Sequence, residues 1–363
     1  MFVPWKVPEA VPAGVCVSLR RGWSRLTLVL GVLASLLLAL GIATTGGGIG
    51  GIGSLMALAY VIVLSIGLGR EAAADVPRLD ARWRELVGDA PEVHHDRRIA
   101  SFGLRLVAVI AILVLATGLA VVVLRNGWWL IALSLVPAVA VLISRRTQLT
   151  ARVWAAGVVA VTAMLLIESL ARGNIVSGLA LALVLAPQVM AGVVLVKASR
   201  VARVWLLEGR PLFAARAFAL GCLLAVPPAL MNVAGMTRAM ASEAEATFTS
   251  VWMAFYALQP AVLEEGWARL FLLPLLYVTL RSAPGATGGR ALVSAVVLSV
   301  VIHGLAHAPQ SIASVTSAVF TALVYGIPLA LLFLRRGLEC ALGYHFFIDF
   351  VRFGYVVLMW AGP

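Results

Sequence analysis

Charged residues are scarce in this chain, and their scarcity excludes a soluble globular protein. Asp, Glu, Lys and Arg make up 12% of the 363 residues, and hydrophobic residues make up 62%. The mean hydropathy is +1.02, and runs of roughly 20 apolar residues are long enough to cross a bilayer. The composition therefore predicts an all-α polytopic membrane protein, located in the cell membrane as a multi-pass protein.

Cysteine and lysine are also rare. The three cysteines, Cys16, Cys222 and Cys340, lie far apart and match no metal-binding or redox spacing. Only Lys6 and Lys197 are lysines, so arginine supplies most of the net charge of +12. These basic residues lie mainly between the apolar runs, which is typical of membrane topology rather than of nucleic-acid binding. We therefore expect the lipid bilayer as a partner and no nucleic acid.

Apolar runs predict about 11 transmembrane helices. Their approximate bounds are 26–45, 49–69, 105–124, 128–144, 153–171, 175–196, 217–235, 251–280, 291–308, 312–334 and 338–360. With alternate loops assigned to one side, that side holds 23 of the 28 basic residues and the other holds 3. Since cytoplasmic loops are enriched in Lys and Arg, this bias predicts a cytoplasmic amino terminus. Segments 72–88 and 198–213 have helical apolar spacing beside arginines, which favours amphipathic helices in the interface.

Ionisable residues inside the predicted span 251–280 mark the candidate site. Glu264, Glu265 and Arg269 would each cost several kcal/mol at membrane depth unless paired or hydrated, so they indicate function. Glu265 and Arg269 are four residues apart, so the arginine can neutralise one carboxylate. Glu264 lies about 100° away around the helix. Two carboxylates facing different ways suit a general base with a positioned neighbour.

Two later spans carry matched polar pairs. His303 and His307 are four residues apart in one, and His345 and Asp349 repeat that spacing in the other. Because such groups avoid lipid, we expect the three helices to pack together around one polar cavity. Arg352 is three residues beyond Asp349, within reach of an ion pair.

These residues resemble the three motifs of the CPBP family, the CAAX-processing and bacteriocin-processing (Abi) intramembrane proteases related to the type II CAAX prenyl endopeptidases. Glu264 to Arg269 match Glu-Glu-x-x-x-Arg, and His307 matches the histidine of Phe-x-x-x-His, with His303 in the phenylalanine position. His345 matches the histidine of His-x-x-x-Asn, with Asp349 replacing the asparagine. The resemblance covers residues 217–363, a protease core, whereas 1–216 form an amino-terminal region of about six spans with no assigned role.

The resemblance implies a role for each matched residue. Glu264 would activate water, Glu265 and Arg269 would hold the site, and His307 would bind the water or carry its proton. His345 and Asp349 would form the oxyanion hole. An ionised aspartate cannot donate to an oxyanion, so Asp349 must be protonated, paired with Arg352, or accept a hydrogen bond from His345.

The implied function is an intramembrane endopeptidase that cleaves a membrane-associated protein or peptide without a cofactor. Two glutamates and two histidines can also bind zinc, which leaves a metallopeptidase as the alternative. A non-catalytic scaffold or bacteriocin-immunity protein of the same fold is a second alternative. An ion-coupled transporter is a third, because intramembrane Glu, His and Asp also serve as relay groups.

Overall fold

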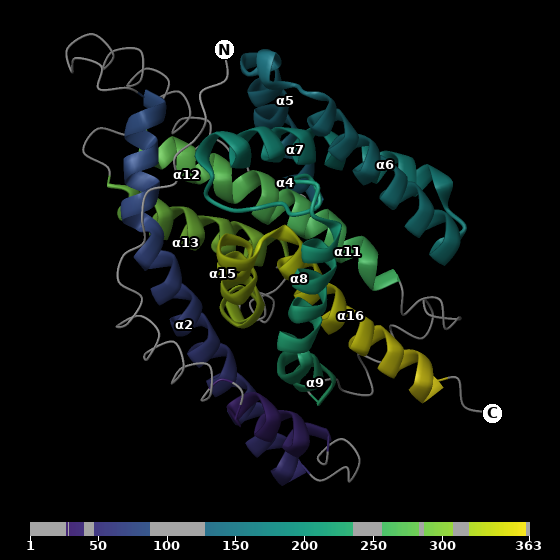
Figure 1. Ribbon diagram of the computed structural model, residues 1–363. Helices are drawn as coiled ribbons and strands as arrows, with labels where there is room; N and C mark the ends of the chain where they lie inside the picture. Colours follow the sequence, from purple (N-terminus) through teal and green to yellow (C-terminus); the bar gives the residue numbers. More distant parts are fainter. Residues whose placement is uncertain are drawn as a thin grey trace.

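The computed structural model describes residues 27, 29–39, 47–87, 128–234, 256–282, 287–307 and 319–360. Within these ranges all the regular secondary structure is helical, which confirms the predicted all-α class (Figure 1). Six described helices are long and apolar enough to cross a membrane, and a bent pair would make a seventh. The chain is a multi-pass membrane protein. The count of 11 spans and the orientation of the amino terminus stay predictions.

The helices follow one another with short connections. In chain order they are α2 (Gly47–Val87), α4 (Trp128–Leu133), α5 (Leu135–Ser144), η2 (Arg146–Gln148), α6 (Ala151–Arg172), α7 (Ile175–Ser199), α8 (Pro211–Leu224), α9 (Val226–Ala234), α11 (Leu258–Glu264), η4 (Glu265–Leu272), α12 (Leu273–Arg281), α13 (Gly288–Ala306), η5 (Ala322–Gly326), α15 (Ile327–Arg336) and α16 (Leu338–Trp360).

Prolines modify two of the predicted spans. Span 128–144 is divided at Ser134 into α4 and α5, three residues before Pro137. Span 217–235 falls in α8 and α9, which meet at an angle of 41° beside Pro227 and Pro228. Proline removes a backbone donor and crowds the preceding turn, which explains both breaks. Span 105–124 lies outside the described residues.

The segment 198–213 is not the amphipathic helix that its spacing predicts. α7 ends at Ser199, α8 begins at Pro211, and the residues between them form turns. Trp205 Nε1 donates to Arg336 O (2.8 Å), and Leu338 N donates to Arg203 O (3.0 Å). The turn between α15 and α16 supplies these partners, so tertiary hydrogen bonds outweigh the local helical pattern here.

The segment 72–88 is helical through Val87 but continues α2 rather than forming a separate interfacial helix. Acidic residues of α2 pair there with arginines at the ends of later helices. We call this set the α2 ion-pair cluster: Glu71, Asp75, Asp80, Arg281, Arg335 and Arg336. Asp80 Oδ1 also accepts from the Gly288 amide at the start of α13 (3.0 Å). The cluster joins the amino-terminal region to the last third of the chain.

α7 packs closely against two neighbouring elements, α6 and η4. α6 and α7 form a hairpin whose turn has Gly173 in the left-handed region (φ 63°) and Asn174 capping the Ser177 amide. α7 packs against η4, where Gly192 faces the backbone of Leu270 and a Cβ would collide with it. α7 therefore packs directly against η4, the helical segment that begins at Glu265 and follows Glu264.

α8 and α16 approach each other with backbone against backbone. A Cβ on Gly221 of α8 would collide with Cys340 O, and a Cβ on Gly343 of α16 would collide with Phe218 O. Small residues at facing positions let membrane helices approach this closely. The contact fixes α16, which carries His345 and Asp349.

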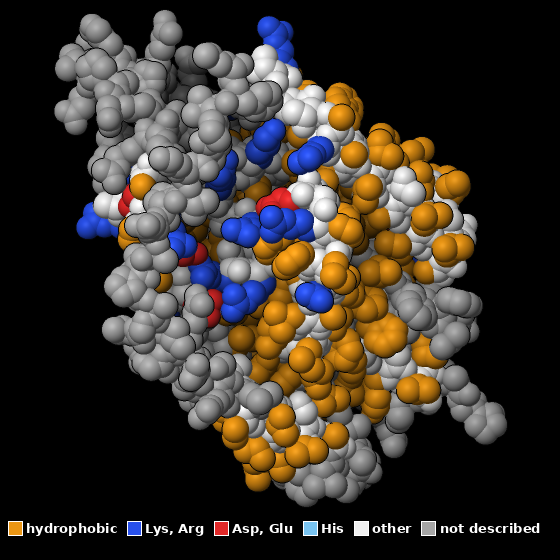
Figure 2. Space-filling view, in the orientation of Figure 1, with side chains coloured by type: hydrophobic (Ala, Val, Ile, Leu, Met, Phe, Trp, Pro, Cys, Tyr) orange, Lys and Arg blue, Asp and Glu red, His pale blue; other side chains and the backbone are white. Residues whose placement is uncertain are grey.

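Much of the outer surface is apolar, as a membrane protein requires. Leu170, Leu358 and Val136 are among the large hydrophobic side chains that are more than two-thirds exposed. In the view of Figure 2, hydrophobic side chains cover the lower and right parts of the face, and Lys and Arg gather in its upper and central part. This separation suits a protein with an apolar belt and a basic side.

Candidate active site

The candidate site is built on a helix that changes its winding at the two glutamates. α11 ends at Glu264, and the next eight residues, Glu265 to Leu272, form the π-helix η4 before α12 continues. π-Helical turns are rare and occur frequently at functional sites. All eight residues of η4 are buried, so the charges of Glu265 and Arg269 lie inside the protein.

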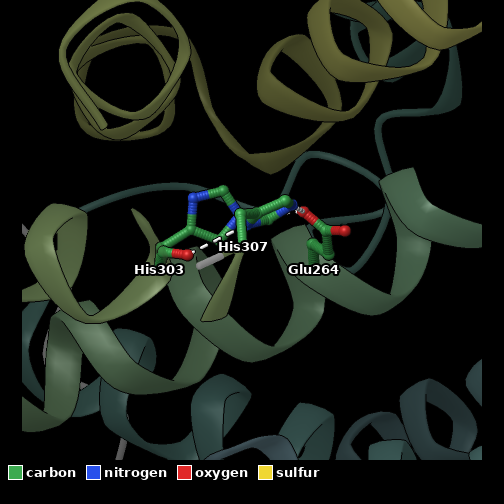
Figure 3. A group of neighbouring side chains, drawn as sticks. All are labelled: Glu264, His303 and His307. Atoms are coloured by element: carbon green, nitrogen blue, oxygen red, sulfur yellow. Dashed lines mark hydrogen bonds and ion pairs between the residues drawn. The ribbon is translucent and has the colours of Figure 1, made fainter. Parts of the chain in front are cut away.

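Glu264 faces two histidines at the end of α13 (Figure 3) and a third on α16. Its Oε2 lies 2.8 Å from His303 Nε2 and 3.3 Å from His307 Nε2, both from the end of α13. The same oxygen lies 3.8 Å from His345 Nε2 of α16. One carboxylate oxygen is therefore within ion-pair distance of three imidazoles.

Glu265 faces the other way and joins α16 to η4. Its Oε1 lies 2.8 Å from His345 Nδ1, and its Oε2 lies 3.4 Å from Arg269 Nε. Arg269 Nη2 donates to Gly326 O of η5 (3.3 Å). The two adjacent glutamates thus contact different partners. Glu264 contacts the histidines of α13, and Glu265 contacts His345 and the buried Arg269.

Asp349 lies one turn beyond His345 on α16. Its Oδ2 is 3.4 Å from His345 Nε2, so the carboxylate is within ion-pair distance of the imidazole. Arg352 is exposed to the surface. Of the three roles expected for this carboxylate, the geometry favours pairing with His345.

The site is closed on most sides and open at His307. The exposed fraction of the side chain is 0% for Glu265, 1% for Arg269 and 2% for His303, but 15% for Glu264 and 36% for His307. Water and a peptide bond could therefore reach Glu264 from the side of His307.

Glu264, His303 and His307 also form a possible metal-ligand set, with donor atoms all within 4.8 Å of one another. Ligands about 2.0–2.2 Å from a tetrahedral zinc ion lie about 3.3 Å apart. The 2.8 Å between Glu264 Oε2 and His303 Nε2 is instead a hydrogen-bond distance. The residue types suit zinc. The contact between Glu264 and His303 has the length of a hydrogen bond, whereas the 3.3 Å between Glu264 Oε2 and His307 Nε2 equals the ligand spacing of a zinc site.

The six residues that were given catalytic roles from the sequence gather in this cluster: Glu264, Glu265, Arg269, His307, His345 and Asp349. Two further participants had no assigned role. His303, named from the sequence only as the partner of His307 on one helix face, is the closest histidine to Glu264. The Gly326 carbonyl, bonded to Arg269, had no sequence signal because any residue supplies a carbonyl.

Comparison with known proteins assigns a family to this part of the chain. Residues 246–351 match the family model described as type II CAAX prenyl endopeptidase Rce1-like. No curated protein and no solved structure matches the chain. The matched range contains every residue of the glutamate and histidine cluster, and the predicted resemblance is confirmed there. Residues 246–351 are therefore similar to the Rce1-like type II CAAX prenyl endopeptidases.

Proposed function

We propose that this protein is an intramembrane endopeptidase in which Glu264 activates a water molecule to hydrolyse a peptide bond. The observation that carries the proposal is the convergence of His303, His307 and His345 on one oxygen of Glu264. A carboxylate held by donors beside an opening is suited to general-base catalysis. The family match of this segment supports a protease.

In this mechanism the water lies against Glu264 and is reached from the open side at His307. The water oxygen attacks the carbonyl carbon of the peptide bond, while its proton passes to Glu264. The proton then moves to the peptide nitrogen, directly or through His307, and the C–N bond breaks. The products are a carboxylic acid and an amine, so atoms and protons balance.

His345 would stabilise the oxyanion of the tetrahedral intermediate. Its Nδ1 is held by Glu265 and its Nε2 faces Asp349 and Glu264, which fixes the ring in one orientation. A preorganised donor aimed at a developing negative charge is a large catalytic factor. Asp349 would orient His345 and would not itself donate to the oxyanion.

The substrate class follows from the membrane and from the family. Because the cluster lies on helices of a membrane protein, we propose a membrane-associated protein or peptide as the substrate. The family description names CAAX prenyl endopeptidases, so a prenylated CAAX peptide is the first probe. The same peptide without the prenyl group would show whether the lipid is needed.

This chemistry needs no metal, and we propose that the enzyme works without a cofactor. Elemental analysis of the purified protein tests this directly. Stoichiometric zinc in the wild type that is lost in His307→Ala would favour the metallopeptidase alternative.

Cleavage by protein reconstituted into liposomes tests the proposed function. Mass spectrometry of the products should show one new carboxyl terminus with the wild type and none with Glu264→Gln. Cleavage that persists unchanged in Glu264→Gln would contradict glutamate catalysis. Absence of cleavage by the folded wild type across prenylated and unprenylated membrane peptides would favour the scaffold or transporter alternatives.

A further inference from the structure

His303 is the most buried of the three histidines around Glu264. Its side chain is 2% exposed, and its ring contacts the rings of Trp267 (centroids 6.2 Å apart) and His307 (4.8 Å). Its Nε2 is 2.8 Å from Glu264 Oε2. Its Nδ1 is buried and has no hydrogen-bond partner within the described residues. The side chain of His303 therefore makes one polar contact within the described residues, from Nε2 to Glu264.

The proton positions on the two α13 histidines can be assigned from their partners. His307 Nδ1 lies 3.0 Å from His303 O, and a carbonyl only accepts, so this Nδ1 carries hydrogen. If His307 is neutral, its Nε2 then carries no hydrogen. The lone pair of this nitrogen would face a lone pair of the Glu264 carboxylate, which is repulsive. One proton must lie between His307 and Glu264 to make the 3.3 Å contact favourable.

His303 has the opposite arrangement. Because Nδ1 has no partner among the described residues, the proton of His303 belongs on Nε2, where Glu264 Oε2 accepts it. His303 is therefore a neutral donor, whereas the proton shared by His307 and Glu264 can move. The two histidines on one helix face are not equivalent.

We propose that His303 is a positioning residue that fixes Glu264 through its Nε2–H and leaves the second carboxylate oxygen for the attacking water. This proposal rests on the proposed function. Without the donor, Glu264 could turn its Oε2 toward His345 (3.8 Å away) or share both oxygens with His307. The carboxylate would then spend less time aligned with the water, and the rate would fall although the substrate still binds.

Two substitutions separate donation from packing. His303→Phe keeps an aromatic ring without a donor, and His303→Gln has an amide N–H that can reach Glu264. We expect His303→Phe to lower kcat by about 100-fold with little change in KM, as misplacement of a reacting group does. His303→Gln should recover most of the kcat. Equal kcat in His303→Phe and wild type would overturn the proposal, and so would an equal loss in both variants.

Controls distinguish this inference from the proposed function. If the wild type cleaves and Glu264→Gln does not, the function stands whatever His303 does. An activity-independent measurement uses nitrogen-labelled histidine, with the His303 signal assigned by its loss in His303→Phe. The wild-type spectrum should show a protonated Nε2 and a bare Nδ1 at His303. A doubly protonated His303, or one protonated at Nδ1, would overturn the assignment even if the variants are inactive.

Discussion

The protein contains two clusters of opposite charges that differ in what they can do. The α2 ion-pair cluster joins carboxylates to arginines only, and its side chains are 11–41% exposed. The Glu264 cluster contains one arginine and three histidines, and several of its side chains are at most 2% exposed. Arginine keeps its proton at any ordinary pH, whereas histidine can exchange it. The first cluster is therefore suited to holding helices together and the second to moving protons.

The same Glu→Gln change in each cluster gives the sharpest test of this difference. Glu264→Gln removes the proposed general base and should lower the cleavage rate by about 100- to 10,000-fold. Glu71→Gln, which weakens contacts to Arg335 and Arg336, should leave the rate near that of the wild type. Single-turnover cleavage in liposomes measures both, and equal losses would show that the two clusters act together.

Arg269 should behave as a structural cation although it lies in the Glu264 cluster. Arg269→Ala leaves the fully buried Glu265 without its neighbouring cation and frees the Gly326 carbonyl. We expect it to destabilise the fold by about 3–5 kcal/mol, as removal of one partner from a buried ion pair does. Thermal unfolding in detergent measures the loss. Unchanged stability would mean that His345 alone compensates Glu265.

Substitutions of His345 and Asp349 should have different effects on activity, although the two side chains are in contact. His345→Ala removes the proposed oxyanion donor and should lower the rate by about 100- to 1,000-fold. Asp349→Asn keeps an acceptor for His345 and adds an amide donor, so activity should be retained or raised. Cleavage assays on the two variants decide the point. If Asp349→Asn is as inactive as Glu264→Gln, the carboxylate itself is essential and the assigned role is wrong.

Substitution of Asp80 should have the smallest effect of these changes, and it should alter only the free energy of unfolding. Asp80→Asn weakens the 2.9 Å contact with Arg281 but keeps an acceptor for the Gly288 amide. For a partly exposed pair we expect a loss of about 0–1 kcal/mol, reduced further by salt. Unfolding at low and high salt should show the difference between wild type and variant shrinking. A large loss of peptidase activity would indicate that α2 controls the site.

Much of the membrane architecture and the residue set of the site could be predicted from sequence. Apolar length marks a span without knowledge of its neighbours, so α6, α7, α13 and α16 lie close to their predicted bounds. The glutamates and histidines were recognisable because ionisable groups are unexpected at membrane depth. Their gathering followed from the cost of leaving any of them in lipid.

Other features depend on tertiary partners that no local pattern contains. The turns at 200–210 form because Trp205 and the Arg203 carbonyl find hydrogen-bond partners between α15 and α16. The π-helical winding of η4 cannot be read from Glu-Gly-Trp-Ala-Arg, which would also fit an α-helix. The role of His303 required knowing that its second nitrogen has no partner in the described structure.

The glycine contact between α8 and α16 has a consequence for the timing of biogenesis. His345 and Asp349 lie on α16, which follows every other described helix in the chain. Gly221 and Gly343 let α16 dock with its backbone directly against that of α8, because neither glycine has a side chain in the contact. Until it does, Glu264 has the α13 histidines but no His345. In the proposed mechanism, a partly inserted chain would therefore lack its oxyanion donor, and it could begin to cleave peptides only after α16 has docked.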